Sequence, residues 1–496
     1  MSFKKRLANI ILSAVLISSM VVTPVFAEPA TPETPAEAPA EEAPAQNVPD
    51  ERGHYSMEYT HDIAPDSNSF SNWPQGPLIN SESAILMDMD TGAVLYAKNA
   101  YKRQFPASIT KLLTVLVALD YVSMDDEVEF TQASIDFLRP GDAHIAMQPG
   151  EIISMEDALY AVLFASANEV SYAVGESVGK KYLNGGYEEF LAKMNEKSLE
   201  LGCKDSHWTN TNGLHNEEHY TTAYDMGLIS AAIYKKPEFN TMMEQFQHEI
   251  PPTNLVDEPR VFQQHHKMTW QNGKYFYEGC KGGKTGFTDD AQTTLVTLAE
   301  KNGVKLAAVL LYDRGGQAYP QTKELLDYGF ENFHKVSVGE NADVQEYEME
   351  SPSLLLPDGV TMDSLVCTTD AVENDERLGK LNYTYNDNLM GTLNVKLTKE
   401  AYKRITGVDT EKNETVEKEQ KDNIDVSDQL QKAMKLSFIV VVSLIVIVLI
   451  VFFIRLAQYK KKKRRKKLAA KKRQQALAAK KRREEQLRKS KKKTRR

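Results

Sequence analysis

The first residues that could do chemistry are a serine and a lysine three positions apart, Ser108 and Lys111. They follow Pro106, a residue that favours helix starts, so both would lie on one face of a first helical turn. Residues 112–119 are almost all apolar, which predicts a helix buried at the centre of a domain. Burial favours the neutral amine of Lys111, which could accept the hydroxyl proton of Ser108 and make the serine nucleophilic.

The S-x-x-K spacing alone is weak evidence, because residues 177–180 and 490–493 have it too. Two further motifs make the pattern specific. Ser166-Ala167-Asn168 lies 58 residues after Ser108, at the end of a predicted helical segment, and Lys284-Thr285-Gly286 lies 176 residues after Ser108, just before a predicted strand hairpin. Three weak motifs in one order are jointly specific.

This order of motifs resembles that of penicillin-binding proteins and class A β-lactamases, with Ser-Ala-Asn in the place of Ser-Asp-Asn. Over about residues 78–400 the chain is similar to the low-molecular-mass penicillin-binding proteins, which are serine D-alanyl-D-alanine carboxypeptidases. Residues 84–92 and 212–214 also match that family, although the latter would serve equally well as a simple turn. The resemblance implies a penicillin-binding, β-lactamase-like α/β (α+β) domain and no cofactor or metal.

The resemblance further implies that the substrate is a peptidoglycan stem peptide ending in D-Ala-D-Ala. Ser108 would attack the carbonyl of the terminal bond, with Lys111 as the base, and β-lactams would acylate the same serine as covalent inhibitors. Ser166 would relay a proton to the leaving amine. Asn168 would hold Lys111 and the substrate amide in place.

The third motif would bind the end of the substrate. Lys284 and Thr285 would bind its free carboxylate, and Gly286 would let the backbone approach closely. The oxyanion hole would be formed by the backbone N–H groups of Ser108 and Phe287. Arg314 would add charge for the carboxylate or would be a solvated loop residue.

Other functions fit the same residues less well. A β-lactamase would need a deacylating base, and no E-x-x-L-N segment follows Asn168. A transpeptidase usually carries large partner-binding modules, which the sequence lacks. A catalytically idle wall scaffold would not need all three motifs. A nucleic-acid binder is not expected, because the excess of basic over acidic residues is confined to one tail.

The elements that must position these motifs are strands at both ends of a helical middle. Residues 84–88 and 93–97 predict a hairpin, and residues 293–298 and 304–312 predict another through Asn302-Gly303. Helices are predicted from Ser108, from Ser154 with its capping pattern, over 187–201 and over 323–333. The pattern predicts a mixed α/β domain whose sheet brings its two ends together.

Targeting signals and charge divide the rest of the chain. A basic start and an apolar stretch from Leu7 to Val22 predict a signal peptide cleaved after Ala27. Leu436–Ile454 is 19 residues without a charge, about 28 Å of helix, and predicts a membrane span. The 42 residues after it carry 23 Lys and Arg against two acidic residues, although the whole chain has a net charge of -9. The predicted parts are 1–27 signal peptide, 28–56 Pro/Ala/Glu-rich disordered spacer, 57–335 catalytic domain, 336–405 small all-β domain, 406–435 membrane-proximal connector, 436–454 transmembrane helix and 455–496 basic cytoplasmic tail.

This arrangement predicts a single-pass protein of the bacterial cytoplasmic membrane. Residues 28–435 would lie outside the cytoplasm, and the tail would lie inside against anionic lipid. The chain's 496 residues allow two or three domains, which excludes a peptide hormone or a small disulfide scaffold. Its three cysteines cannot all pair within one chain, so disulfides are not the main source of stability.

Overall fold

The computed structural model describes residues 48–371 and 376–408. The predicted signal peptide, most of the predicted spacer and connector, the predicted span 436–454 and the basic tail lie outside the described residues. Within the two described ranges, no helix combines the length and the apolar character needed to span a bilayer.

The chain divides into two compact units between Tyr59 and Thr60. In the first unit, the carboxylate of Asp50 accepts the backbone N–H groups of Arg52 and His54 and so closes a turn. The helix α1, Met57–Asp62, begins in this unit. All the motifs described above belong to the second unit.

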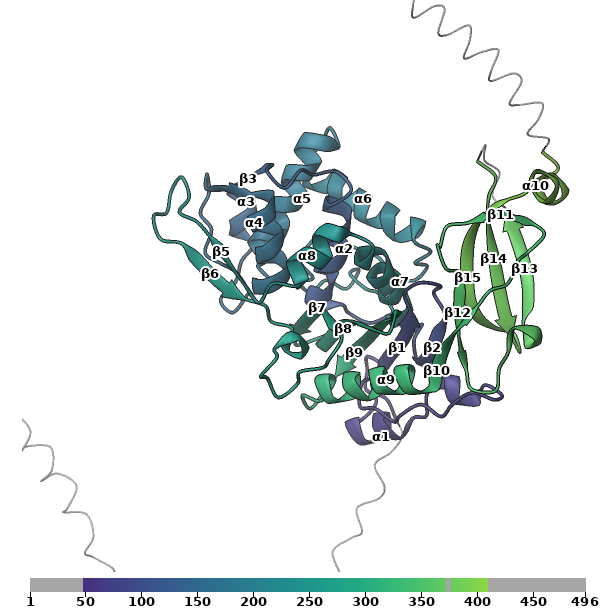
Figure 1. Ribbon diagram of the computed structural model, residues 1–496. Helices are drawn as coiled ribbons and strands as arrows, with labels where there is room; N and C mark the ends of the chain where they lie inside the picture. Colours follow the sequence, from purple (N-terminus) through teal and green to yellow (C-terminus); the bar gives the residue numbers. More distant parts are fainter. Residues whose placement is uncertain (1–47, 372–375, 409–496) are drawn as a thin grey trace, which may run out of the picture. The chain divides into compact units, whose positions relative to one another are not determined.

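The second unit is built on a five-stranded antiparallel sheet (Figure 1). The order β2-β1-β9-β8-β7 places the first strands of the domain beside the last ones, as the sequence predicts. Both predicted hairpins are confirmed, and the second turns at Asn302 and Gly303, which have φ angles of 52° and 75°. The strands are β1 Ser83–Asp88, β2 Val94–Lys98, β7 Cys280–Thr288, β8 Gln292–Lys301 and β9 Val304–Asp313.

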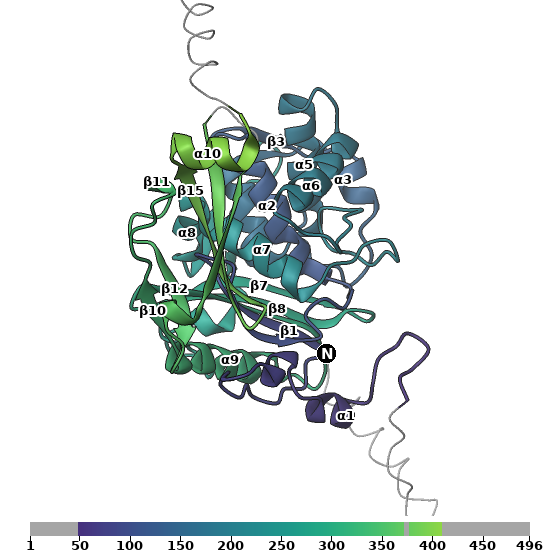
Figure 2. The same ribbon diagram turned by 90° about the vertical axis from the view of Figure 1, so that its right-hand side faces the viewer.

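Helices cover both faces of the sheet (Figure 2). On one face Ile85 and Met87 pack into the core formed with the helical part, and on the other Leu86 and Leu306 pack into the core that contains residues of α9, Ala318–Asn332. Because both faces are buried, the strands read as nearly continuous apolar runs. The mixed α/β architecture predicted from the sequence is thereby confirmed.

The helical part lies between β2 and β7 in the chain. The cap predicted at Ser154 is confirmed, since its hydroxyl accepts the N–H of Asp157 at 3.1 Å. The helix predicted over 187–201 is also confirmed, whereas the closing helix α9 begins five residues before the predicted Lys323. The helices are α2 Lys111–Ala118, α3 Ala133–Asp136, α4 Met155–Tyr160, α5 Asn168–Tyr182, α6 Tyr187–Glu200, α7 Ala223–Tyr234 and α8 Pro237–Met243.

Two small antiparallel pairs lie at the edge of the helical part. The strands β3, Glu127–Glu129, and β4, Ile152–Ser154, flank a long loop, and the strands β5, Gln247–Ile250, and β6, Arg260–Gln263, form a hairpin. The first pair matters for the site because its loop supplies residues 140–143 to the pocket, and the second because it contacts that loop.

After α9 the chain is rich in strands. β10, Phe333–Ser337, pairs with β12, Ser353–Pro357, and a four-stranded sheet has the order β11-β15-β14-β13. The predicted boundary between residues 335 and 336 stays a prediction, because β10 crosses it. The prediction of an all-β region missed the helix α10, Lys399–Thr406, which Thr398 caps and which buries Tyr402. The other strands are β11 Val344–Tyr347, β13 Val366–Ala371, β14 Leu378–Tyr385 and β15 Asn388–Leu397.

Candidate active site

Ser108 and Lys111 lie where the chain enters the central helix. Residues 107–110 form a 3-10 turn that continues into α2, so the α-helix begins at Lys111 rather than at Ser108. Every residue of α2 is buried, as the apolar pattern predicts. Lys111 Nζ lies 3.0 Å from Ser108 Oγ, within hydrogen-bond distance. The structure therefore brings the predicted nucleophile and base together.

Lys111 Nζ also contacts two other hydrogen-bond acceptors. Its Nζ donates to Asn168 Oδ1 at 2.7 Å and to the backbone carbonyl of Asn212 at 2.5 Å. Burial of the whole side chain lowers the pKa of Lys111 well below its ordinary value, and the nearby charge of Lys284 lowers this pKa further. Lys111 can therefore be uncharged while its amine lies next to the Ser108 hydroxyl.

A tight turn packs directly against the nucleophile. Ala107 has a φ angle of 50°, an uncommon conformation for a residue with a side chain. A Cβ atom on Gly213 would lie 1.9 Å from the carbonyl oxygen of Ala107, so only glycine fits this close approach. The segment 212–214 packs against the nucleophile, lines the pocket through Gly213 and Leu214, and supplies the Asn212 carbonyl to Lys111.

Ser166 and Asn168 are presented by a break between two helices. A five-residue π-helical segment, Ala161–Ala165, follows α4 and ends at Ser166, which has a left-handed φ of 57°. Asn168 then begins α5 with its side chain toward Lys111. The structure therefore places both residues of the second motif beside the first motif.

The third motif lies on β7, the edge strand of the sheet. Lys284 is buried, and its Nζ donates to Ser166 Oγ at 2.9 Å and to the carbonyl of Thr285 at 2.7 Å. Burial lowers the pKa of Lys284 to about 7. This lysine thus links the third motif to the second, in addition to the carboxylate-binding role expected for it.

Gly286 lets β7 pass close to the nucleophile. A Cβ atom at this position would lie 2.3 Å from Thr294 Oγ1 and 2.8 Å from the backbone nitrogen of Ser108. Because glycine lacks that atom, the strand that carries Phe287 packs against the turn that carries Ser108. The two proposed oxyanion-hole residues therefore belong to elements in direct contact.

These groups surround one pocket with a volume of about 760 Å³. The side chain of Phe287 is 62% exposed at its rim, and Lys111 and Lys284 are buried behind its wall. Its lining residues include members of all three motifs and a stretch of the loop before β4: Ser108, Pro140, Gly141, Asp142, Ala143, Ser166, Asn168, Thr285, Gly286 and Phe287. The pocket can hold a short peptide end with its carbonyl against Ser108.

Comparison with known proteins gives the same assignment. A family model described as D-alanyl-D-alanine carboxypeptidase matches residues 71–315, a range that contains all three motifs. The D-alanyl-D-alanine carboxypeptidase DacF of Bacillus subtilis (strain 168) is 32% identical over 268 residues, which cover 51% of this chain and 63% of that protein. Over residues 71–315 the chain is similar to the D-alanyl-D-alanine carboxypeptidase family.

Other relatives cover more of their own length. The D-alanyl-D-alanine carboxypeptidase DacB2 of Mycobacterium tuberculosis is 28% identical over 280 residues, with 54% of this chain and 87% of that protein covered. Among solved structures, the Streptomyces K15 DD-transpeptidase is similar at 22% identity and a TM-score of 0.48, covering 52% of this chain and 100% of that one.

One candidate residue does not line the pocket, and two residues beside the second motif were not predicted. Arg314 is not among the residues that line the pocket; its guanidinium contacts the Thr60 hydroxyl at 3.4 Å and lies over the ring of Tyr312. Sequence reasoning also missed Ala143, whose carbonyl accepts the N–H of Asn168 at 2.8 Å, and Glu169. Ala143 acts through its backbone, which leaves no residue-type signal.

The described residues were also compared with the requirements of a metal site and of a cysteine nucleophile. Among residues 48–371 and 376–408, no group of three His, Cys, Asp or Glu side chains could hold a metal ion. Cys203, Cys280 and Cys367 are free thiols, and burial raises the pKa of Cys203 to about 12. A thiol with so high a pKa is a poor nucleophile at neutral pH.

Proposed function

We propose that this chain is a serine D-alanyl-D-alanine carboxypeptidase that removes the terminal D-Ala from peptidoglycan stem peptides during cell-wall maturation. The observation that carries the proposal is the position of the buried Lys111 amine, 3.0 Å from Ser108 Oγ and 2.7 Å from Asn168 Oδ1. The match of residues 71–315 to the D-alanyl-D-alanine carboxypeptidase family model supports the same activity.

The reaction would proceed through an acyl-enzyme. Ser108 Oγ attacks the carbonyl carbon of the penultimate D-Ala while its proton passes to the neutral amine of Lys111. The resulting oxyanion accepts the N–H groups of Ser108 and Phe287. As the peptide bond breaks, the leaving amine takes a proton through Ser166, and water then hydrolyses the ester to release the shortened peptide and the free serine.

The third motif would orient the substrate for this attack. Lys284, held by Ser166, supplies positive charge near the free carboxylate, and Thr285 lines the pocket where its hydroxyl can donate to the same group. β-Lactams present a carbonyl and a carboxylate with similar spacing. They would acylate Ser108 and block the enzyme.

Release of a single D-Ala tests the activity. The detergent-solubilised full chain, incubated with a synthetic stem pentapeptide ending in D-Ala-D-Ala, should yield a tetrapeptide one alanine lighter by mass spectrometry. A pentapeptide ending in L-Ala-L-Ala should remain intact. Formation of a joined peptide in place of the tetrapeptide would favour a transpeptidase, and rapid turnover of penicillin would favour a β-lactamase.

We also propose that the enzyme is anchored in the bacterial cytoplasmic membrane, with its catalytic domain outside. The support is in the sequence: an N-terminal signal, the uncharged segment 436–454 and the basic tail after it. The tail would lie on anionic lipid, since each Lys or Arg near such a surface contributes roughly 1 kcal/mol.

Protease added to intact spheroplasts tests this topology. We expect the protease to digest residues 28–435 and to spare an epitope tag placed after Arg496, because the positive charge behind the span keeps the tail in the cytoplasm. A tag that is lost while a cytoplasmic marker protein survives would contradict the proposed orientation.

A further inference from the structure

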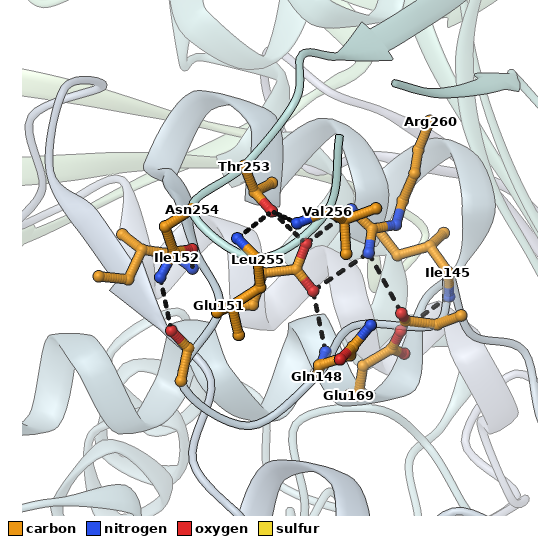
Figure 3. A network of polar contacts seen from close by, with 12 residues as sticks. Ile145, Gln148, Glu151, Ile152, Glu169, Thr253, Asn254, Leu255, Val256 and Arg260 are labelled. Carbon is orange, nitrogen blue, oxygen red and sulfur yellow. Dashed lines mark hydrogen bonds and ion pairs between the residues drawn. The ribbon is translucent and has the colours of Figure 1, made fainter. Parts of the chain in front are cut away.

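A buried carboxylate lies at the end of the loop that precedes β4, residues 139–151. Glu151 is fully buried and accepts two hydrogen bonds from the guanidinium of Arg260, at 2.7 and 3.1 Å (Figure 3). It also accepts the hydroxyl of Thr253 at 2.7 Å and the N–H of Gln148 at 2.9 Å. A buried ion pair with this many donors is strongly disturbed when either partner is removed.

The β5–β6 hairpin holds the 139–151 loop at more than this one point. Arg260 also donates to the carbonyl of Ala146 at 3.2 Å, and Ala146 has a left-handed φ of 58°. In the same hairpin, the side chain of Asn254 donates to the Gly150 carbonyl at 2.8 Å and accepts the N–H of Ile152 at 2.9 Å. The hairpin therefore fixes an unusual backbone conformation in this loop.

Residues in the middle of the 139–151 loop contact the second motif and the residue after it. The carbonyl of Ala143 accepts the N–H of Asn168 at 2.8 Å, and the N–H of Ile145 donates to the buried carboxylate of Glu169 at 2.7 Å. The Oδ1 atom of Asn168 in turn accepts a hydrogen bond from Lys111 Nζ. The hairpin is thus joined to the base through hydrogen bonds on both sides of a short stretch of loop backbone.

We propose that Glu151 and Arg260 are positioning residues for acylation: they hold the 139–151 loop where it fixes Asn168 against Lys111. The inference rests on the proposed function, because it concerns the same acylation step. Neither side chain is among the residues that line the pocket, so both would act through the loop. A displacement of about 1 Å in such a contact can cost on the order of 10² in rate.

The test compares acylation rates of the full-length, solubilised protein. Arg260→Gln and Glu151→Gln should each slow acylation by a fluorescent penicillin by about 10- to 100-fold. Each rate is normalised to the amount of protein that is labelled at the end of the reaction. The double variant should lose little more than the slower single variant, because both changes break the same ion pair. Arg260→Lys should recover part of the rate.

The pH profile separates positioning from mere stabilisation. If Asn168 moves away, the Lys111 ammonium loses an acceptor, so its pKa falls and the acid limb of the acylation profile moves to lower pH in Arg260→Gln. As a matched control, Arg404→Gln breaks a distant ion pair with Asp343 and should change neither the rate nor the profile.

Three outcomes decide the inference. Variants that acylate at the wild-type rate with an unchanged profile, whatever their melting temperature, would overturn it. Should both buried variants fail to fold, Asn254→Ala, which leaves the ion pair intact, must still slow acylation, and a wild-type rate there would also overturn it. A wild-type protein that penicillin does not acylate would instead refute the proposed function, before any variant is compared.

Discussion

Ser108→Ala should abolish covalent labelling by penicillin. The β-lactam carbonyl forms its ester only with the serine oxygen that lies 3.0 Å from Lys111 Nζ. Without that oxygen no acyl-enzyme can form, so labelled protein should fall to background on a denaturing gel while the variant keeps its far-UV circular dichroism spectrum. The fold should tolerate the change, because Ser108 is only partly buried.

The chain contains a matched control for this experiment. Ser177 and Lys180 have the same S-x-x-K spacing, but they lie within α5, and Lys180 is more than half exposed and paired with Glu176 at 2.8 Å. Its amine is therefore not desolvated. Ser177→Ala should be labelled like the wild type, and labelling that persists in Ser108→Ala would contradict the assignment of the nucleophile.

Lys111→Ala should lose about 10² to 10⁴ in acylation rate, the usual contribution of a general base. Its pKa lies well below the ordinary value, because the whole side chain is buried. The neutral amine is the reactive form, so the wild-type rate should rise with pH through this lowered pKa and level off above it. Stopped-flow acylation by a chromogenic β-lactam across pH 5 to 10 measures both effects.

Lys111→Arg distinguishes a base from a positive charge. The guanidinium stays protonated at every accessible pH, so the arginine variant should be as slow as the alanine variant and should show no rise through the lysine pKa. An arginine variant with wild-type activity would mean that residue 111 supplies only charge. Retained binding of a non-covalent substrate analogue would show that the pocket is still formed.

Much of the fold follows from local pattern. The Asn302-Gly303 pair, the cap at Ser154 and the apolar run of α2 each specify their own element through backbone sterics, capping or burial. Strands at both ends of a helical middle also predict that the two ends share a sheet. The sequence pattern did not predict α10, a short capped helix of eight residues that follows a strand.

The residue types that could do the chemistry can be read from the sequence, because a nucleophile, a base and a carboxylate binder need particular functional groups in a particular order. How these groups are held became visible only in the folded chain. The Asn212 carbonyl on Lys111 and the Ala143 carbonyl on Asn168 are backbone contacts between residues distant in the chain. Any residue has a carbonyl group, so no side-chain pattern can reveal such contacts, and they depend wholly on how the loops pack.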